Sequence, residues 1–184
     1  MKKYELTSEF VTNDFGTKLF RIKALVSFGC VEEGQLGGFV EKEENLSHDG
    51  NAWVDGNAWV SGNARVDGNA RIIDNARIID NARITGNARV DGNACVTGNA
   101  CVTGNADYAV VTGFGRYFRA TTFFRCVDKI VRVQCGCFYG NLAQFREIVK
   151  KTHGDSKYAK EYLAIADLME LHFSDADAKQ EASE

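Results

Sequence analysis

The stretch that decides the fold is residues 50–107, which read GNAWVD GNAWVS GNARVD GNARII DNARII DNARIT GNARVD GNACVT GNACVT GNAD. Every unit has six residues, with alanine and a β-branched aliphatic residue at fixed places two residues apart. In an extended chain, both therefore point to the same side. A period of six would smear these residues around a helix. The repeat predicts short strands joined by Gly-Asn corners and stacked into a coil, with alanine, valine and isoleucine inside.

The V-x-G-N-A-x pattern resembles the hexapeptide-repeat proteins, which implies a left-handed parallel β-helix with three units in each triangular coil. The repeat would then make about three coils, stacked at roughly 4.8 Å. The flanking segments LGGFVEKEENLSHDGNAWV and GCFYGNLAQFREIVKKTHGDSKYAKEYLAI resemble small phage and prophage proteins. The hexapeptide resemblance also implies a homotrimer of helices packed side by side, with ligands in the clefts between subunits.

The sequence divides into five parts around this coil. Residues 1–49 are expected to form an N-terminal cap or irregular first coil ahead of the repeat at 50–107. Residues 108–140 are rich in valine, phenylalanine, tyrosine and threonine, which predicts a small β-sheet. Residues 141–173 are expected to form a helical hairpin, and the polar tail 174–184 is expected to be disordered. The fold class is therefore mainly β, with a sheet and a helical hairpin after the coil.

Local signals support the prediction for the second half of the chain. Asn141 and Gln144 have the spacing of a capping box at a helix start, and Gly154 is placed to end that helix. Turns are expected at 113–115 and 128–129. The strands are expected at 108–113, 116–126 and 129–138.

The outward side chains of the coil form columns, because residues 18 apart stack when three units make a turn. Two arginines ~5 Å apart in water repel by about 0.8 kcal/mol, so an anion near each column would be favourable. Two sources are open: an anionic ligand, or the chain's own Asp55, Asp67 and Asp91 two residues along. The columns are Trp53, Arg71 and Arg89; Trp59, Arg77 and Cys95; and Arg65, Arg83 and Cys101.

Ile73 and Ile79 stand at outward positions where other units carry Asp, Ser or Thr. Apolar side chains on the outside of a coil indicate a covered surface. The cover could be a second subunit or the chain's own tail. Because hexapeptide β-helices usually assemble as trimers, we expect a homotrimer with these residues at its interface.

The segment RYFRATTFFR at 116–125 combines arginines with aromatic rings, within a locally basic region of a chain whose net charge is −3. Arginine can bind a phosphate with two parallel hydrogen bonds, and an aromatic ring can stack on a base. Arg116, Tyr117 and Arg119 are therefore candidate ligand-binding residues. The alternative is an amphipathic strand whose arginines are simply solvated.

Many hexapeptide-repeat proteins are acyltransferases that use a histidine as a general base, so each histidine of this sequence is a candidate catalytic residue. His48, His153 and His172 are the candidates, but none has an acidic partner at a convincing spacing. The sequence also has no Ser-His-Asp arrangement, no P-loop and no dinucleotide-binding fingerprint. No catalytic residue is therefore assigned.

The six cysteines are expected to be thiols in a reducing cytosol. Cys135 and Cys137, with Cys126, could bind a metal ion, but zinc sites usually have wider pairs and a fourth ligand. The alternating run around them predicts thiols that face a core. We expect neither a metal nor a cofactor.

Taken together, these features favour a non-catalytic phage protein that counters a host defence in the host cytoplasm. It would sequester an anionic, nucleotide-like signal or occlude a host protein. A structural scaffold of the phage and an acyltransferase-like enzyme are the alternatives. With no apolar stretch of 18 residues, no membrane partner is expected, and the pI of about 5.7 disfavours direct DNA binding.

Overall fold

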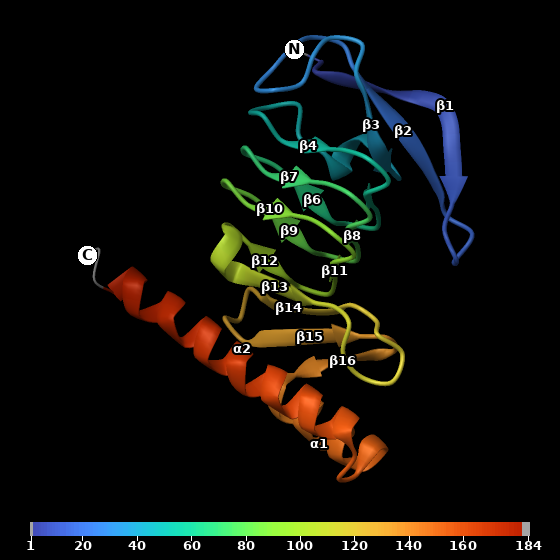
Figure 1. Ribbon diagram of the computed structural model, residues 1–184. Coiled ribbons are helices and arrows are strands. Elements are labelled where there is room, and N and C mark those ends of the chain that lie inside the picture. Colours follow the sequence, from blue (N-terminus) through green and yellow to red (C-terminus); the bar gives the residue numbers. More distant parts are fainter. Residues whose placement is uncertain (1, 182–184) are drawn as a thin grey trace. The chain divides into compact units, whose positions relative to one another are not determined.

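The computed structural model describes residues 2–181, with side chains for 2–174. It divides into two compact units, Met1–Asn105 and Ala106–Glu184. The first unit is a β-solenoid of about four turns with parallel, stacked strands (Figure 1). The predicted β-helix is therefore confirmed, while its left hand stays a prediction that rests on the resemblance.

The regular part of the solenoid consists of nine two-residue strands. They pair in parallel as three sheets, β4-β7-β10, β5-β8-β11 and β6-β9-β12. Arg71 pairs with both Trp53 and Arg89, which confirms three units to a coil and the stacking of residues 18 apart. The strands are β4 (Trp53–Val54), β5 (Trp59–Val60), β6 (Arg65–Val66), β7 (Arg71–Ile72), β8 (Arg77–Ile78), β9 (Arg83–Ile84), β10 (Arg89–Val90), β11 (Cys95–Val96) and β12 (Cys101–Val102).

The interior is the predicted filling of small and β-branched side chains. Each alanine from Ala52 to Ala100 and each inward valine or isoleucine, which recurs every sixth residue from Val54 to Val102, is at most 1 % exposed. Full burial of one such valine or isoleucine contributes about 1.5–3 kcal/mol. The repeated core therefore stabilises every coil to a similar degree.

Asparagine ladders run along the corners. The Asn51 amide donates to Asn69 at 3.0 Å, and the Asn69 amide donates to Asn87 at 3.1 Å. At two corners an aspartate replaces glycine, and Asp74 and Asp80 both keep the positive φ of 62°. Their carboxylates accept hydrogen bonds from the backbone N–H groups of glycines in the next coil, which compensates for the strained backbone.

The N-terminal region adds three longer strands and one 3-10 turn, η1 (Glu43–Asn45), to the solenoid. Strand β3 pairs in parallel with β5, Phe39 opposite Trp59, so the irregular coil that contains β3 is two residues longer than the regular coils that follow it. Gly37 allows the close approach, because a Cβ there would lie 2.5 Å from the carbonyl oxygen of Val54. The strands are β1 (Tyr4–Thr12), β2 (Lys18–Ala24) and β3 (Leu36–Val40).

The second unit is an antiparallel four-stranded sheet followed by two helices. Its strands are β13 (Tyr108–Val111), β14 (Thr121–Arg125), β15 (Val131–Cys135) and β16 (Phe138–Asn141), in that order across the sheet, and a second 3-10 turn, η2 (Asn105–Asp107), precedes them. The helices are α1 (Leu142–His153) and α2 (Lys157–Glu181). They form the predicted hairpin, and together with the sheet they bury Phe123, Val133, Phe145, Val149, Ala159, Tyr162, Ile165, Ala166, Met169 and Phe173.

The capping prediction for α1 is confirmed. The Asn141 side chain accepts a hydrogen bond from the Gln144 backbone, and the Gln144 side chain accepts one from the Asn141 backbone, both at 2.9 Å. Gly154 ends the helix with a φ of 54°. The predicted disorder of residues 174–184 falls almost entirely outside the residues whose side chains are described.

Two predicted strands differ from the structure. The strand expected at 116–126 is only β14, because residues 112–120 form a loop in which Phe118 takes a φ of 53°. The strand expected at 129–138 is split by a turn at Gly136, with a φ of 58°. Cys137 consequently lies exposed in that turn instead of facing the core, and only Cys135 is half-buried.

We expect substitutions at the aspartate corners to change the free energy of unfolding by a measurable amount. Asp74→Ala removes the hydrogen bond from Gly92 and leaves a left-handed alanine, so it should lower the free energy of unfolding by about 1–2 kcal/mol. Asp74→Gly keeps the permissive backbone and should cost less. Both tryptophans, Trp53 and Trp59, lie in the first unit, so urea unfolding followed by tryptophan fluorescence reports on this unit alone. Equal losses in the two variants would contradict the backbone argument.

Candidate functional site

A cavity in the second unit brings three of the sequence-predicted site residues together, and we call it the Arg119 pocket. It has a volume of about 460 Å³. The loop 112–120, the β15–β16 turn, α1 and the start of α2 form its walls. Its lining residues are Arg116, Tyr117, Arg119, Cys135, Gly136, Cys137, Phe138, Phe145, Ile148, Val149, Thr152, His153 and Tyr162.

The loop that carries both arginines is held against α2. The backbone N–H of Gly115 donates to the Glu161 carboxylate at 2.9 Å. A Cβ on Gly115 would lie 2.0 Å from the Tyr162 hydroxyl oxygen, so only glycine fits against this ring. Gly113, Gly115 and Phe118 all have positive φ, a backbone that is strained for phenylalanine. The loop is therefore a defined structure that presents its arginines at a fixed place.

The pocket is basic and aromatic. The guanidinium groups of Arg116 and Arg119 lie 5.5 and 5.1 Å from the Tyr117 ring centre. In the described part of the chain neither arginine has an ion-pair partner, and no acidic residue lines the pocket. Two exposed guanidinium groups in the lining thus have no ion-pair partner among the described residues, which favours an anionic ligand.

A chain of hydrogen bonds links three side chains at the inner wall of the Arg119 pocket. The Thr121 hydroxyl donates to Cys135 Sγ at 3.2 Å, and the Cys135 thiol donates to the Tyr162 hydroxyl oxygen at 4.0 Å. Burial, with a contribution from the Cys135 thiol, raises the pKa of Tyr162 to about 12. The phenol therefore stays protonated at neutral pH and can donate its own hydrogen to a ligand oxygen.

The structure separates the sequence-predicted site residues into two groups. Arg116, Tyr117 and Arg119 come together in the Arg119 pocket. The five arginines of the repeat form the predicted columns, but the columns lie in three different sheets of the solenoid and do not converge on one site. These five are Arg65, Arg71, Arg77, Arg83 and Arg89.

The repeat arginines find few acidic partners. Of these five arginines, only Arg89 forms an ion pair with another described residue, Asp91 at 3.4 Å. Arg71 contacts the Cys30 thiol, while Arg65 and Arg83 stand side by side without a side-chain partner. The sequence left open whether the chain's own aspartates neutralise the arginine columns. In the structure they do so at one column.

The two tryptophans that begin their columns are more buried than the sequence indicated. Trp53 is 0 % exposed, because Phe28 packs edge-on against it with ring centres 5.5 Å apart. Trp59 is half-buried, and the Arg77 guanidinium lies 5.7 Å from its ring centre. Trp53 is thus part of the core in this structure and not a stacking platform.

Ile73 and Ile79 do not form one flat patch. They follow β7 and β8, which belong to different sheets, and both are half-buried. A trimer through these residues stays a prediction.

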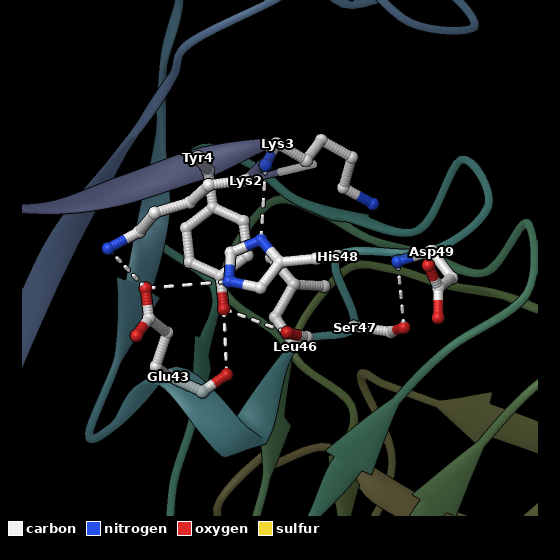
Figure 2. Close-up of polar contacts among 8 residues, drawn as sticks. All are labelled: Lys2, Lys3, Tyr4, Glu43, Leu46, Ser47, His48 and Asp49. Carbon is white, nitrogen blue, oxygen red and sulfur yellow. Dashed lines mark hydrogen bonds and ion pairs between the residues drawn. The ribbon is translucent and has the colours of Figure 1, made fainter.

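A polar cluster at the start of the chain, which the sequence did not reveal, closes the first coil (Figure 2). Where a backbone hydrogen bond between coils involves a residue outside the two-residue strands, the N–H group lies in one coil and the carbonyl group in the next. The first regular coil, residues 50–67, therefore has carbonyl groups at its corners that need other donors. Lys3 Nζ donates to the carbonyl oxygens of Gly50 at 3.3 Å and Ala52 at 2.9 Å. Asn45 Nδ2 donates to those of Gly62 and Ala64 on another face. We call the cluster of Lys2, Lys3, Tyr4, Glu43, Leu46 and His48 the N-terminal clasp.

His48 belongs to this clasp. Its Nδ1 accepts the backbone N–H of Lys3 at 3.2 Å, and its Nε2 lies 3.4 Å from Glu43, an acidic partner that sequence spacing did not predict. The Tyr4 ring stacks on the imidazole with ring centres 4.4 Å apart (Figure 2). Both ring nitrogens are thus engaged within the chain, which assigns His48 a structural role in this conformation.

The remaining histidines lie in the second unit. His153 lines the Arg119 pocket with its ring centre 5.8 Å from that of Tyr162, and His172 is exposed on α2. Within the described residues, no three His, Cys, Asp or Glu side chains gather in a way that could hold a metal ion. No described helix is long and apolar enough to cross a membrane.

Comparison with known proteins finds no family model that matches this chain and no curated protein that matches it. The Arg119 pocket must therefore be interpreted from its own geometry.

The clasp should give the first unit a distinct pH dependence. Burial lowers the pKa of Lys3 from 10.5 to about 8. Between these values the unfolded chain binds the proton and the folded chain does not, so stability rises with pH from about 8 toward 10. Burial also raises the pKa of Tyr4 above its usual value of 10.0, which lowers stability at still higher pH.

Lys3→Met should abolish the alkaline rise, which amounts to about 1–2 kcal/mol after solvent screening is allowed for. The measurement is urea unfolding by tryptophan fluorescence at several pH values, with the exposed neighbour changed in Lys2→Met as the matched control. A constant difference between wild type and Lys3→Met across this range would show that Lys3 does not titrate as described.

Proposed function

We propose that this protein is a non-catalytic binding protein that captures a small, anionic, ring-bearing ligand of the nucleotide type in the Arg119 pocket. The observation that carries the proposal is the pairing of two guanidinium groups that lack carboxylate partners with an apolar, aromatic cavity of about 460 Å³. This volume lies in the range typical of small-molecule sites.

The two parts of the pocket suit the two parts of such a ligand. Arg116 and Arg119 offer forked N–H donors for phosphate oxygens. Tyr117, 64 % exposed, can stack on a base, and Phe138 and Ile148 in the pocket lining offer apolar contacts. The Tyr162 hydroxyl supplies one more donor. In the setting that the phage resemblance implies, capture would withdraw a nucleotide signal from the host cytoplasm.

A second candidate function is the occlusion of a host protein with an acidic surface. The observation in its favour is that the same loop also exposes Phe114 and Phe118, by 43 % and 69 %. Exposed aromatic side chains beside arginines are the composition of interface hot spots. A protein partner would use the outside of the loop, and a small ligand would use the cavity behind it.

The test begins with the full chain purified from bacteria and examined by native mass spectrometry for a bound nucleotide. Isothermal titration calorimetry then measures ADP, adenosine and inorganic phosphate as defined probes. We expect Arg116→Ala with Arg119→Ala to weaken ADP binding about 10- to 100-fold, because each arginine–phosphate contact is a charge-assisted hydrogen bond. Adenosine binding should change little.

The matched control is Arg65→Ala with Arg83→Ala, two exposed arginines of the solenoid that also lack side-chain partners. ADP affinity should be unchanged in this variant. If the control loses affinity and the pocket variant does not, the ligand binds the arginine columns instead. If none of the probes binds and no nucleotide co-purifies, the nucleotide proposal is wrong.

A further inference from the structure

Two cysteines flank a single glycine in the turn between β15 and β16. Cys135 ends β15 and pairs with Phe138, the first residue of β16, so Gly136 and Cys137 alone form the turn. Gly136 takes the positive φ of 58° that this tight turn requires. Cα atoms two residues apart lie within roughly 7 Å of each other, close to the separation of a disulfide. The turn therefore keeps the two cysteines near the separation at which they can be bridged.

Both cysteines line the Arg119 pocket, but they differ in exposure. Cys137 is exposed, whereas Cys135 is half-buried. A reagent that enters from solvent therefore reaches the Cys137 thiol more easily. Cys135 is the less accessible sulfur of the pair and lines the same cavity.

The surroundings of Cys135 suit a sulfur that takes up negative charge. The Thr121 hydroxyl donates to its Sγ at 3.2 Å, and the Tyr162 hydroxyl oxygen lies 4.0 Å from the same atom. Both hydroxyl groups can donate a hydrogen to the sulfur when it is a thiolate. A thiolate is the form that attacks, and the form that leaves, in thiol–disulfide exchange.

Positive charge beside the turn favours an anionic reagent. A Cβ built on Gly136 would lie 3.7 Å from Arg119 Nη1, so the guanidinium lies beside the glycine that separates the two cysteines. Arg116 lines the same pocket and, like Arg119, is exposed. Two cations beside a thiol raise the local concentration of an anionic partner. A small disulfide that carries carboxylates matches this charge.

We propose that Cys137 and Cys135 form a dithiol site that reduces small anionic disulfides of the glutathione type. The Cys137 thiolate attacks one sulfur of the reagent, which breaks the S–S bond of the reagent and releases a first thiolate. The Cys135 thiolate then attacks Cys137 Sγ, which releases a second thiolate and leaves a Cys135–Cys137 disulfide. Two electrons pass from the protein to the reagent, and the two cysteine protons end on the two released thiols.

The disulfide that forms is transient in a reducing compartment, because an excess of reduced thiol reverses the same two steps. The site lies in the Arg119 pocket but does not rest on nucleotide capture. Its readout is the mass of the cysteine-containing peptides and not the binding of ADP, so its failure is distinguishable from failure of the proposed function.

The test exposes the reduced full chain to an excess of oxidised glutathione, stops the reaction with acid, and maps the peptides by mass spectrometry. In wild type, the peptide with both cysteines of the turn should lose two hydrogens. Cys135→Ser should instead accumulate one glutathionyl group on Cys137, because the second step is lost. Cys137→Ser should form no disulfide at the turn. Far-ultraviolet circular dichroism establishes that the variants are folded.

Cys30 is an internal control in the same digest. It is exposed and contacts the Arg71 guanidinium, but the next cysteine in the sequence is Cys95. It therefore shares the exposure and the neighbouring charge of Cys137 and lacks a second cysteine two residues away. Its reaction should stop at the mixed disulfide with glutathione.

The arginines are tested by the charge of the reagent. Arg116→Ala with Arg119→Ala should slow the reaction of Cys137 with oxidised glutathione about 3- to 10-fold at low salt. The reaction with the neutral disulfide of mercaptoethanol should keep its rate. The proposal is overturned by a folded wild type that forms no disulfide at the turn, by Cys135→Ser protein without the adduct on Cys137, or by arginine variants that slow both reagents alike.

Discussion

Outside the pairing of the two-residue strands, the backbone hydrogen bonds between coils of the solenoid run in one direction, from the N–H groups of one coil to the carbonyl groups of the next. At their corners, the two ends of the solenoid therefore require opposite chemistry. At the first regular coil the N-terminal clasp supplies the Lys3 ammonium as a donor, Asn45 of η1 supplies its amide, and Phe39 of β3 supplies its backbone N–H group. In the last coil the backbone N–H of Arg89 is accepted by the Asn105 side-chain oxygen. The polar residues around the repeat are explained by this directionality.

The sequence predicted most of the regular solenoid and little of the N-terminal clasp that caps it. A period of six specifies which side chains point inward, because a slip of one residue would expose every valine and isoleucine. The clasp joins Lys3 to His48 and Ala52 across more than forty residues, and no local pattern links such positions. For the same reason the sequence placed Trp53 on the surface, although Phe28 covers it.

The candidate site was predicted in part. The composition of residues 116–125 indicated arginines and aromatic rings, and Arg116, Tyr117 and Arg119 do line one pocket. The β-branched and aromatic composition suggested a strand from residue 116 onward, but the glycines at 113 and 115 and the left-handed Phe118 make residues 112–120 a loop. The inner wall, with Cys135, Tyr162 and His153, comes from three separate elements that only tertiary packing brings together. The arginines could be predicted from composition, whereas the cavity behind them could not.

The register of 18 residues has a consequence for how such a protein can vary in length. Asparagine, alanine and aliphatic positions superimpose from coil to coil, and the clasp contacts only the first coil. A whole coil gained or lost by duplication or deletion of eighteen codons would leave both ends chemically unchanged. The solenoid is thus a spacer whose length can change in steps of one inter-strand distance, about 4.8 Å. Insertions of other sizes would shift the aliphatic residues onto another face.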